Sequence, residues 1–300
     1  MILYFLAVAI TAFVLTALVS GNNLSAAVGT LIGSRSLSKF GGSLLGAVGF
    51  SAGLVIQGGS LHSTAYTLLP DNDLIIELAL LIALFIFIIA NLLRVPLSLI
   101  MALVGTSIGL SFKFGTHLNY GVVSLIIITW IIAPFLSVTL SYLFNRWMTA
   151  LKPQNVWNFA RNIKILLLVI SFFTAFTLGA NTLGFISEVA RLHGYYTILL
   201  VIAVFIGSFF LSSGIVRRVA TEMYMMRYTN AFVSLAVSSI LVEAATFLGI
   251  PLSNTQTLTS SVFGSGLSYK EKAMDMRPFL ITMATWIISP LLGILFGYLI

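Results

Sequence analysis

Long apolar segments alternate with short polar ones along the whole chain. Two of them, Leu74–Leu93 and Ile163–Leu178, reach or approach the ~20 residues that an α-helix needs to cross a bilayer. We expect membrane-spanning helices over Ile2–Val19, Gly41–Ile56, Leu74–Leu93, Leu99–Phe112, Gly121–Phe144, Ile165–Leu178, Thr197–Leu211, Asn230–Leu248, Leu258–Leu267 and Phe279–Ile300. The pattern therefore predicts an all-α polytopic membrane protein.

The chain carries an internal repeat. The sequence Thr-Trp-Ile-Ile-x-Pro occurs at Thr129–Pro134 and again at Thr285–Pro290. The pairs Val95–Ser98 with Ile250–Ser253, and Gly21–Asn23 with Ala180–Thr182, keep nearly the same separation along the chain. One duplication explains all three pairs. We predict two transmembrane repeats, residues 1–144 and 165–300, joined by a cytoplasmic linker over residues 145–164.

The basic residues lie mostly in short loops between apolar segments, where cytoplasmic loops of membrane proteins are enriched in Lys and Arg. One of these loops is the 145–164 linker. The others carry Arg35 and Lys39; Arg94; Arg217, Arg218 and Arg227; and Lys270, Lys272 and Arg277. All can be cytoplasmic together if each half crosses about five times, counting the weak segments after Pro96 and Pro251. The halves then have inverted topology, and both termini lie outside the cytoplasm.

Composition supports a membrane protein and excludes several functions. The chain is 59% hydrophobic and only 8% charged, whereas soluble domains carry about a quarter charged residues. The absence of cysteine excludes disulfides, thiol catalysis and thiolate metal sites. The net charge of +7 resides in loops, so we expect no nucleic-acid partner. His62, His117 and His193 show no metal-ligand spacing, and no Walker loop or His-Glu-x-x-His motif supports an enzyme.

The two proline breaks are the first candidate site. Proline interrupts helical hydrogen bonding, and a polar break inside a membrane is tolerated only in protein or beside a wet cavity. Helices that start after Pro96 and Pro251 would direct free N–H groups at the breaks, and two such ends form an anion site without Lys or Arg. The breaks supply Ser98, Ser253, Asn254, Thr255 and Gln256. The alternative is that these groups only satisfy one another at a helix contact.

Two asparagines and one glutamate are further candidates. Asn22 and Asn181 each follow small residues near the end of an apolar segment, so we expect the helix to unwind there and expose backbone groups. Each asparagine could instead be a C-cap. Glu243 is the acidic residue deep within a strongly apolar segment, which makes it a candidate proton carrier.

These residues resemble the motifs of the inorganic phosphate transporter (PiT) family. That family carries Gly-Ala-Asn-Asp-x-x-Asn-Ala near the start of each half and Pro-x-Ser-Thr-Thr-His before a Gly-rich segment. The first motif resembles Ser20–Ala27 and Gly179–Thr182, and the second resembles Pro96–Met101 and, more fully, Pro251–Gln256. Arg217–Ala220 also resembles a family stretch. The resemblance covers nearly the whole chain in order and spacing.

The resemblance implies an oxyanion, phosphate or in some branches sulfate, held between the two Pro-x-Ser breaks. The implied substrate-binding residues are Asn22, Ser98, Asn181, Ser253, Asn254 and Thr255. The candidate cation-coupling residues are Asn23, Thr182 and Gln256, which lie in these motifs, and Glu243, which is a candidate as an intramembrane carboxylate. Both family aspartates are replaced, by Asn23 and Thr182, which removes charge that would hold Na⁺. Proton coupling through Glu243 and an all-neutral sodium site both stay open.

The sequence thus predicts a secondary active transporter of phosphate or a similar tetrahedral oxyanion, coupled to H⁺ or Na⁺, in which the inverted repeats alternate access. A passive anion channel and a non-transporting scaffold or sensor are the alternatives. The expected partners are the oxyanion and the lipid bilayer, with a homodimer left open. We expect no resident metal or cofactor and a multi-pass location in the cell membrane. Because the first break reads Ser98-Leu99-Ile100, we expect the second half to hold the anion more tightly.

Overall fold

The computed structural model describes residues 2–33, 36–93, 95–151, 155–211, 223, 227–268 and 275–300. Within these ranges every regular element is helical, which confirms the all-α prediction. The first half contains α1 (Ile2–Gly33), α2 (Lys39–Gln57), η1 (Gly58–Leu61), α3 (His62–Leu68), α4 (Asp73–Leu92), α5 (Leu99–Phe114) and α6 (Tyr120–Ala150). The second half contains α7 (Val156–Leu178), η2 (Gly179–Leu183), α8 (Gly184–Val189), η3 (Gly194–Tyr196), α9 (Thr197–Phe210), α11 (Tyr228–Phe247), α12 (Asn254–Leu267) and α13 (Arg277–Leu299).

Several helices are long and apolar enough to cross a membrane. Among the described residues, seven spans meet that criterion, and α5 and the η3–α9 segment are shorter apolar helices. Large apolar side chains such as Ile131 and Phe135 of α6 are exposed, Phe135 to 71%. Such an apolar surface is stable in contact with lipid, whereas contact with water is unfavourable for it. The chain is therefore a multi-pass membrane protein.

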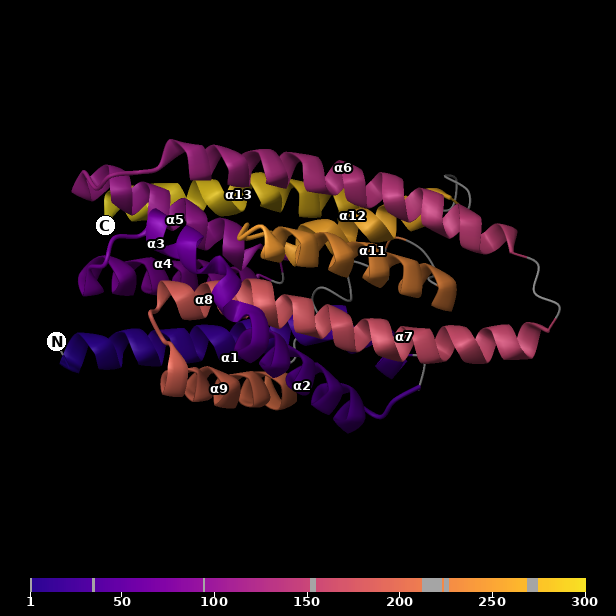
Figure 1. Ribbon diagram of the computed structural model, residues 1–300. Coiled ribbons are helices and arrows are strands. Elements are labelled where there is room, and N and C mark those ends of the chain that lie inside the picture. The colour runs from indigo at the N-terminus through magenta and orange to yellow at the C-terminus, as the bar shows by residue number, and fades with distance from the viewer. Residues whose placement is uncertain are drawn as a thin grey trace.

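The two halves run in opposite directions through one bundle (Figure 1). In Figure 1, α1 and α6 run away from the side where both termini lie, whereas α7 and α13 run back toward it. The arrangement agrees with the predicted inverted repeats. Arg35, Arg94, Arg217, Arg218, Lys270 and Lys272, on which the predicted orientation depends, lie outside the described residues. Which side is cytoplasmic therefore stays a prediction.

Both proline breaks are present, and each forms the turn between the two helices of a hairpin inside the protein. Pro96 lies between α4 and α5, and Pro251 lies between α11 and α12. The Lys113 ammonium at the end of α5 donates to the Leu299 carbonyl beside the C-terminus, at 3.4 Å. The Asn145 amide at the far end of α6 donates to the Ser265 carbonyl near the end of α12, at 3.1 Å. Hence the two hairpins return to opposite sides of the bundle.

The duplicated motifs contact each other crosswise. The Trp130 indole N–H of α6 donates to the Pro251 carbonyl at 2.9 Å, and the Thr285 hydroxyl of α13 donates to the Pro96 carbonyl at 3.1 Å. Gly109 and Gly264 occupy matching positions, and a Cβ on them would lie 2.3 Å from Ile294 O and 2.2 Å from Val138 O, respectively. Each half therefore supplies the helix that supports the other half's break.

Replacing Trp130 with phenylalanine tests this support. Trp130→Phe keeps an aromatic ring, although a smaller one, and leaves the buried Pro251 carbonyl without the indole donor, so beyond the effect of ring size we expect a loss of about 1–2 kcal/mol in unfolding free energy. The matched control is Trp286→Phe, because the Trp286 indole N–H is buried without an acceptor among the described residues. Thermal unfolding in detergent should show a lower midpoint for Trp130→Phe alone. Equal midpoints would contradict the assignment.

The helix does not unwind at Asn22 as predicted. Helix α1 continues to Gly33, because its buried backbone groups keep their helical partners there. Gly21 serves a close helix approach instead, since a Cβ there would lie 2.7 Å from the Gly207 carbonyl oxygen of α9. At Asn181 the helix also continues, but with a π-helical turn over Gly179–Leu183. Such turns often mark functional positions in helices.

The polar connection between the halves is shorter than the expected 145–164 linker. Helix α6 extends to Ala150, and α7 begins at Val156. Asn145 is fully buried and donates from its amide to Ser265 and Ser268 of the α12 hairpin, so its polarity reflects a helix contact and not a loop.

Candidate functional site

A small cavity lies where the two proline breaks approach each other. Its lining combines both halves: Asn23, Phe87, Leu97, Ser98, Leu99 and Ile100 from the first, and Thr182, Ser253, Asn254 and Thr255 from the second. Its volume is about 20 Å³, which is room for about one water molecule. A tetrahedral oxyanion has five heavy atoms, so the cavity as it stands is too small to hold one.

Two helix N-termini meet at this cavity. Ser98 caps α5 by accepting from the Met101 N–H at 3.4 Å, and Ser253 caps α12 by accepting from the Gln256 N–H at the same distance. The first N–H groups of a helix have no partner within the helix. For Leu99, Ile100, Asn254 and Thr255, all cavity-lining, the described part of the chain offers these N–H groups no acceptor. The partial positive charge of both helix ends favours an anion here.

Asn254 adds an unused donor. Its side chain is 4% exposed, and its Oδ1 accepts from the Ser238 hydroxyl at 3.3 Å. Its Nδ2 has no hydrogen-bond acceptor within the described residues. A buried donor without a partner costs about 1–3 kcal/mol, and a bound acceptor would recover that cost. The Ser253 and Thr255 hydroxyls pair with each other at 2.9 Å and can rotate toward a ligand.

The lining carries no ionisable side chain among the described residues. Its polar atoms are hydroxyls, amides and helix N–H groups, so donors are abundant and no carboxylate repels an anion. The first half contributes Phe87, Leu97, Leu99 and Ile100, whereas the second half contributes mostly polar side chains. The cavity thus presents neutral donors to an anion, with more of them on the second half.

Asn181 lies beside the cavity but does not line it. Its amide donates to the Ile250 carbonyl at 3.1 Å and to the Thr246 hydroxyl at 2.8 Å, and its Oδ1 accepts from the Leu252 N–H at 3.0 Å. Both amide hydrogens are used, and the side chain is fully buried. Asn181 is neither a C-cap nor an exposed ligand. It fixes the backbone on both sides of Pro251.

Three other predicted residues also lie outside the cavity lining. The Gln256 amide donates to the Trp130 carbonyl at 2.8 Å and so ties α12 to α6. Glu243 is buried on α11, where its Oε2 has no hydrogen-bond donor within the described chain. Asn22 lies in α1 next to the cavity-lining Asn23. The cavity thus brings together Asn23, Ser98, Thr182, Ser253, Asn254 and Thr255 of the ten predicted residues.

Two groups of residues were not found by sequence reasoning. Phe87 of α4 lines the cavity, and within the apolar segment around it nothing distinguishes it from its neighbours. His62, Glu188 and His193 gather into a cluster although the sequence spacing predicted no metal site. The pair His62 and Glu188 is 126 residues apart, so only the packing of the two halves brings them together.

Known proteins resemble the chain over almost its full length. A provisionally named phosphate permease of Methanocaldococcus jannaschii is 25% identical, over 97% of this chain and 95% of the relative. The sulfate permease CysP of Bacillus subtilis is also 25% identical, over 94% of this chain and 83% of the relative. A solved structure titled "The sodium-dependent phosphate transporter" superposes with a TM-score of 0.84 at 15% identity, covering 99% of this chain and 97% of that one, which shows the shared fold.

The sequence profile of the phosphate transporter family matches this chain twice, over residues 19–196 and 158–297. The two matches together extend across both halves and the cavity between them, and they agree with the duplication of the motifs. The chain belongs to the phosphate transporter family.

Proposed function

We propose that this protein is a cation-coupled secondary transporter of phosphate or a similar tetrahedral oxyanion such as sulfate. The observation that carries the proposal is the meeting of two capped helix N-termini in one cavity, where the described residues leave the Asn254 Nδ2 unpaired and contribute no ionisable side chain. An oxyanion has acceptors in several directions and matches such a donor set. The relatives named for phosphate and for sulfate fit the same substrate class.

The small size of the cavity supports a carrier over a passive channel. A channel needs a continuous polar path, whereas this cavity has room for about one water molecule and is lined in part by the apolar side chains of Phe87, Leu97 and Ile100. Binding would require the halves to separate on one side at a time. The two hairpins return to opposite sides, so each could open a different access route. Alternating access between the repeats is therefore our proposed mechanism.

Sodium is the coupling ion that the geometry favours. Asn23 and Thr182 line the same cavity as the proposed anion site, whereas Glu243 does not. Their oxygens are neutral, but a bound oxyanion would itself supply negative charge next to them. Sodium takes oxygen ligands. Transport of Na⁺ and of the oxyanion would then be coupled, because each ion binds weakly when the opposite charge of the other is absent.

Uptake into proteoliposomes tests the proposal. We expect saturable uptake of labelled phosphate or sulfate that rises several-fold with an inward Na⁺ gradient, and much less with an imposed pH gradient. If H⁺ drives uptake and Na⁺ does not, the sodium assignment is wrong. Unsaturable flux without gradient dependence would favour a channel. Binding without flux would favour a sensor, and neither binding nor flux of both anions would refute the substrate class.

A further inference from the structure

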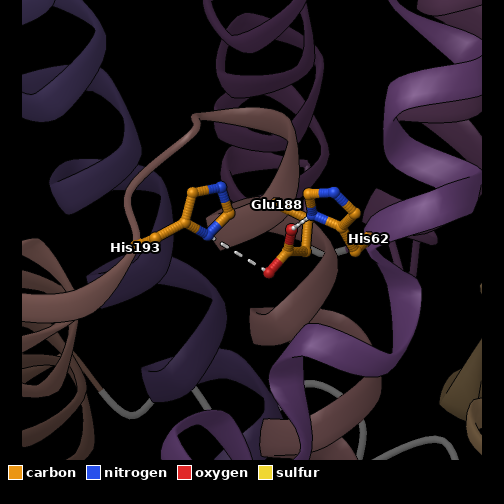
Figure 2. A group of neighbouring side chains, drawn as sticks. All are labelled: His62, Glu188 and His193. Atoms are coloured by element: carbon orange, nitrogen blue, oxygen red, sulfur yellow. Dashed lines mark hydrogen bonds and ion pairs between the residues drawn. The ribbon is translucent and has the colours of Figure 1, made fainter.

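His62, Glu188 and His193 form a cluster away from the oxyanion cavity (Figure 2). His62 starts α3 in the first half, Glu188 belongs to α8, and His193 follows α8 in the second half. His62 Nδ1 lies 2.8 Å from Glu188 Oε2, and His193 Nδ1 lies 3.4 Å from Glu188 Oε1. Figure 2 shows the two imidazole rings on either side of one carboxylate.

We propose that this cluster binds a divalent transition-metal ion of the zinc class and thereby links the two halves of the protein. The three ligand atoms all lie within 4.8 Å of one another. Zinc bonds of about 2.0–2.2 Å in a tetrahedral set place ligand atoms about 3.3–3.5 Å apart. Small side-chain rotations would therefore bring the three ligands to bonding distance. Three protein ligands leave one position for water or another exchangeable ligand.

The donor set selects the class of ion. Imidazole nitrogens suit zinc, copper, nickel and iron, whereas magnesium and calcium prefer all-oxygen sites. The Glu188 side chain is 5% exposed, but those of His62 and His193 are 55% and 42% exposed. A metal ion can thus reach the site from the exposed side, where the two imidazole rings lie. The buried Glu188 carboxylate supplies the negative charge that attracts it.

The surroundings hold His193 and its ring in place. The Tyr66 hydroxyl lies 3.4 Å from His193 Nε2, so Nε2–H can donate to it while Nδ1 faces the metal. Such outer partners fix the tautomer of metal-binding histidines. The Ser187 hydroxyl donates to the Leu192 carbonyl at 2.8 Å, and the Leu192 N–H donates to the Ser187 carbonyl at 3.0 Å. Arg191 adopts a left-handed φ of 57°, which turns the chain so that His193 returns toward Glu188.

Arg191 is the nearby cation that could oppose metal binding, but its guanidinium is engaged elsewhere. It lies 3.3 Å from the Tyr66 ring centroid and donates to the backbone carbonyls of Glu188 and Leu69, both at 3.0 Å. Its Nε also lies 3.7 Å from an Asp71 carboxylate oxygen. Both Glu188 carboxylate oxygens therefore remain directed at the two histidines.

Zinc binding to the purified full-length protein tests the site without any transport assay. After treatment with a chelator, the protein in detergent is equilibrated with micromolar ZnCl₂, and bound zinc and the thermal midpoint are measured. We expect about one zinc per chain and a raised midpoint, because a ligand bound only to the folded state stabilises it. MgCl₂ should not compete at similar concentrations.

Variants identify the ligands. The double variant His62→Ala/His193→Ala removes two exposed rings and should weaken zinc binding by at least about a hundredfold, while Tyr66→Phe should weaken it by about tenfold. His117→Ala, which removes an exposed histidine outside the cluster, should bind zinc as the unmodified protein does. Glu188→Gln is a further variant, but its buried position could impair folding, so the double histidine variant decides. Equal zinc affinity in the double variant, or no saturable zinc binding at all, would overturn the proposal.

Discussion

Asn254→Asp is expected to abolish oxyanion uptake. The change is isosteric, and the Ser238 hydroxyl can still donate to the new side chain. It removes the unpaired Nδ2 donor and places a carboxylate in the cavity, against the anion. Two like charges about 4 Å apart at an effective dielectric constant near 20 repel by about 4 kcal/mol. That energy corresponds to roughly a thousandfold loss of affinity.

The control is the same substitution at a surface cap. Asn72 is exposed and caps α4 by accepting from the N–H groups of Leu74 and Ile75. Aspartate caps helices about as well as asparagine, so Asn72→Asp should leave uptake unchanged. Labelled phosphate and sulfate uptake would be compared in proteoliposomes with equal protein content. If Asn254→Asp transports as well as Asn72→Asp, the oxyanion does not bind at the second break.

Asn181→Leu is expected to destabilise the whole second hairpin. The substitution leaves the buried Ile250 carbonyl and Leu252 N–H without their amide partners on either side of Pro251. At about 1–3 kcal/mol for each unsatisfied buried group, the free energy of unfolding should fall by about 2–6 kcal/mol. Because these groups position Ser253 and Asn254, protein that still folds should also bind the anion poorly. Thermal or denaturant unfolding in detergent measures the loss of stability.

Asn158→Leu provides the comparison for this variant. Asn158 is exposed near the start of α7, far along the same helical segment from Asn181. Its replacement should shift the unfolding midpoint little, since exposed substitutions usually change stability by less than about 0.5 kcal/mol. An Asn181→Leu protein as stable as Asn158→Leu would show that the three amide hydrogen bonds contribute little. Intact stability with lost transport would instead return Asn181 to the substrate site.

The sequence is sufficient to locate the helices and the two breaks, and through the duplication it also locates part of the site. Apolar segments near the length of a bilayer crossing leave few alternatives, because every backbone group in lipid must be bonded within a helix or a closed barrel. Proline fixes the two breaks because it cannot donate a backbone hydrogen bond. The duplication then paired Ser98 with Ser253 and Asn23 with Thr182, and all four line one cavity.

The errors share one cause, which is that polarity in a membrane sequence does not say what a group contacts. Asn145 indicated a loop, but it is a buried helix contact. Gly21 indicated an unwound helix, but it allows α1 to approach α9. In each case the partner lies on a distant segment, and helix packing alone selects it.

The sequence by itself determined the class of protein, the two halves, the proline breaks and most of the residues at the cavity. These features follow from local rules: bilayer thickness sets helix length, and proline and N-caps set helix ends. Only the tertiary structure decided which groups meet. Trp130 forms a hydrogen bond with Pro251, which is 121 residues away in the sequence, and His62 pairs with Glu188, which is 126 residues away. Such contacts depend on the relative rotation and depth of packed helices, because a shift of one residue turns a side chain by about 100° around its helix.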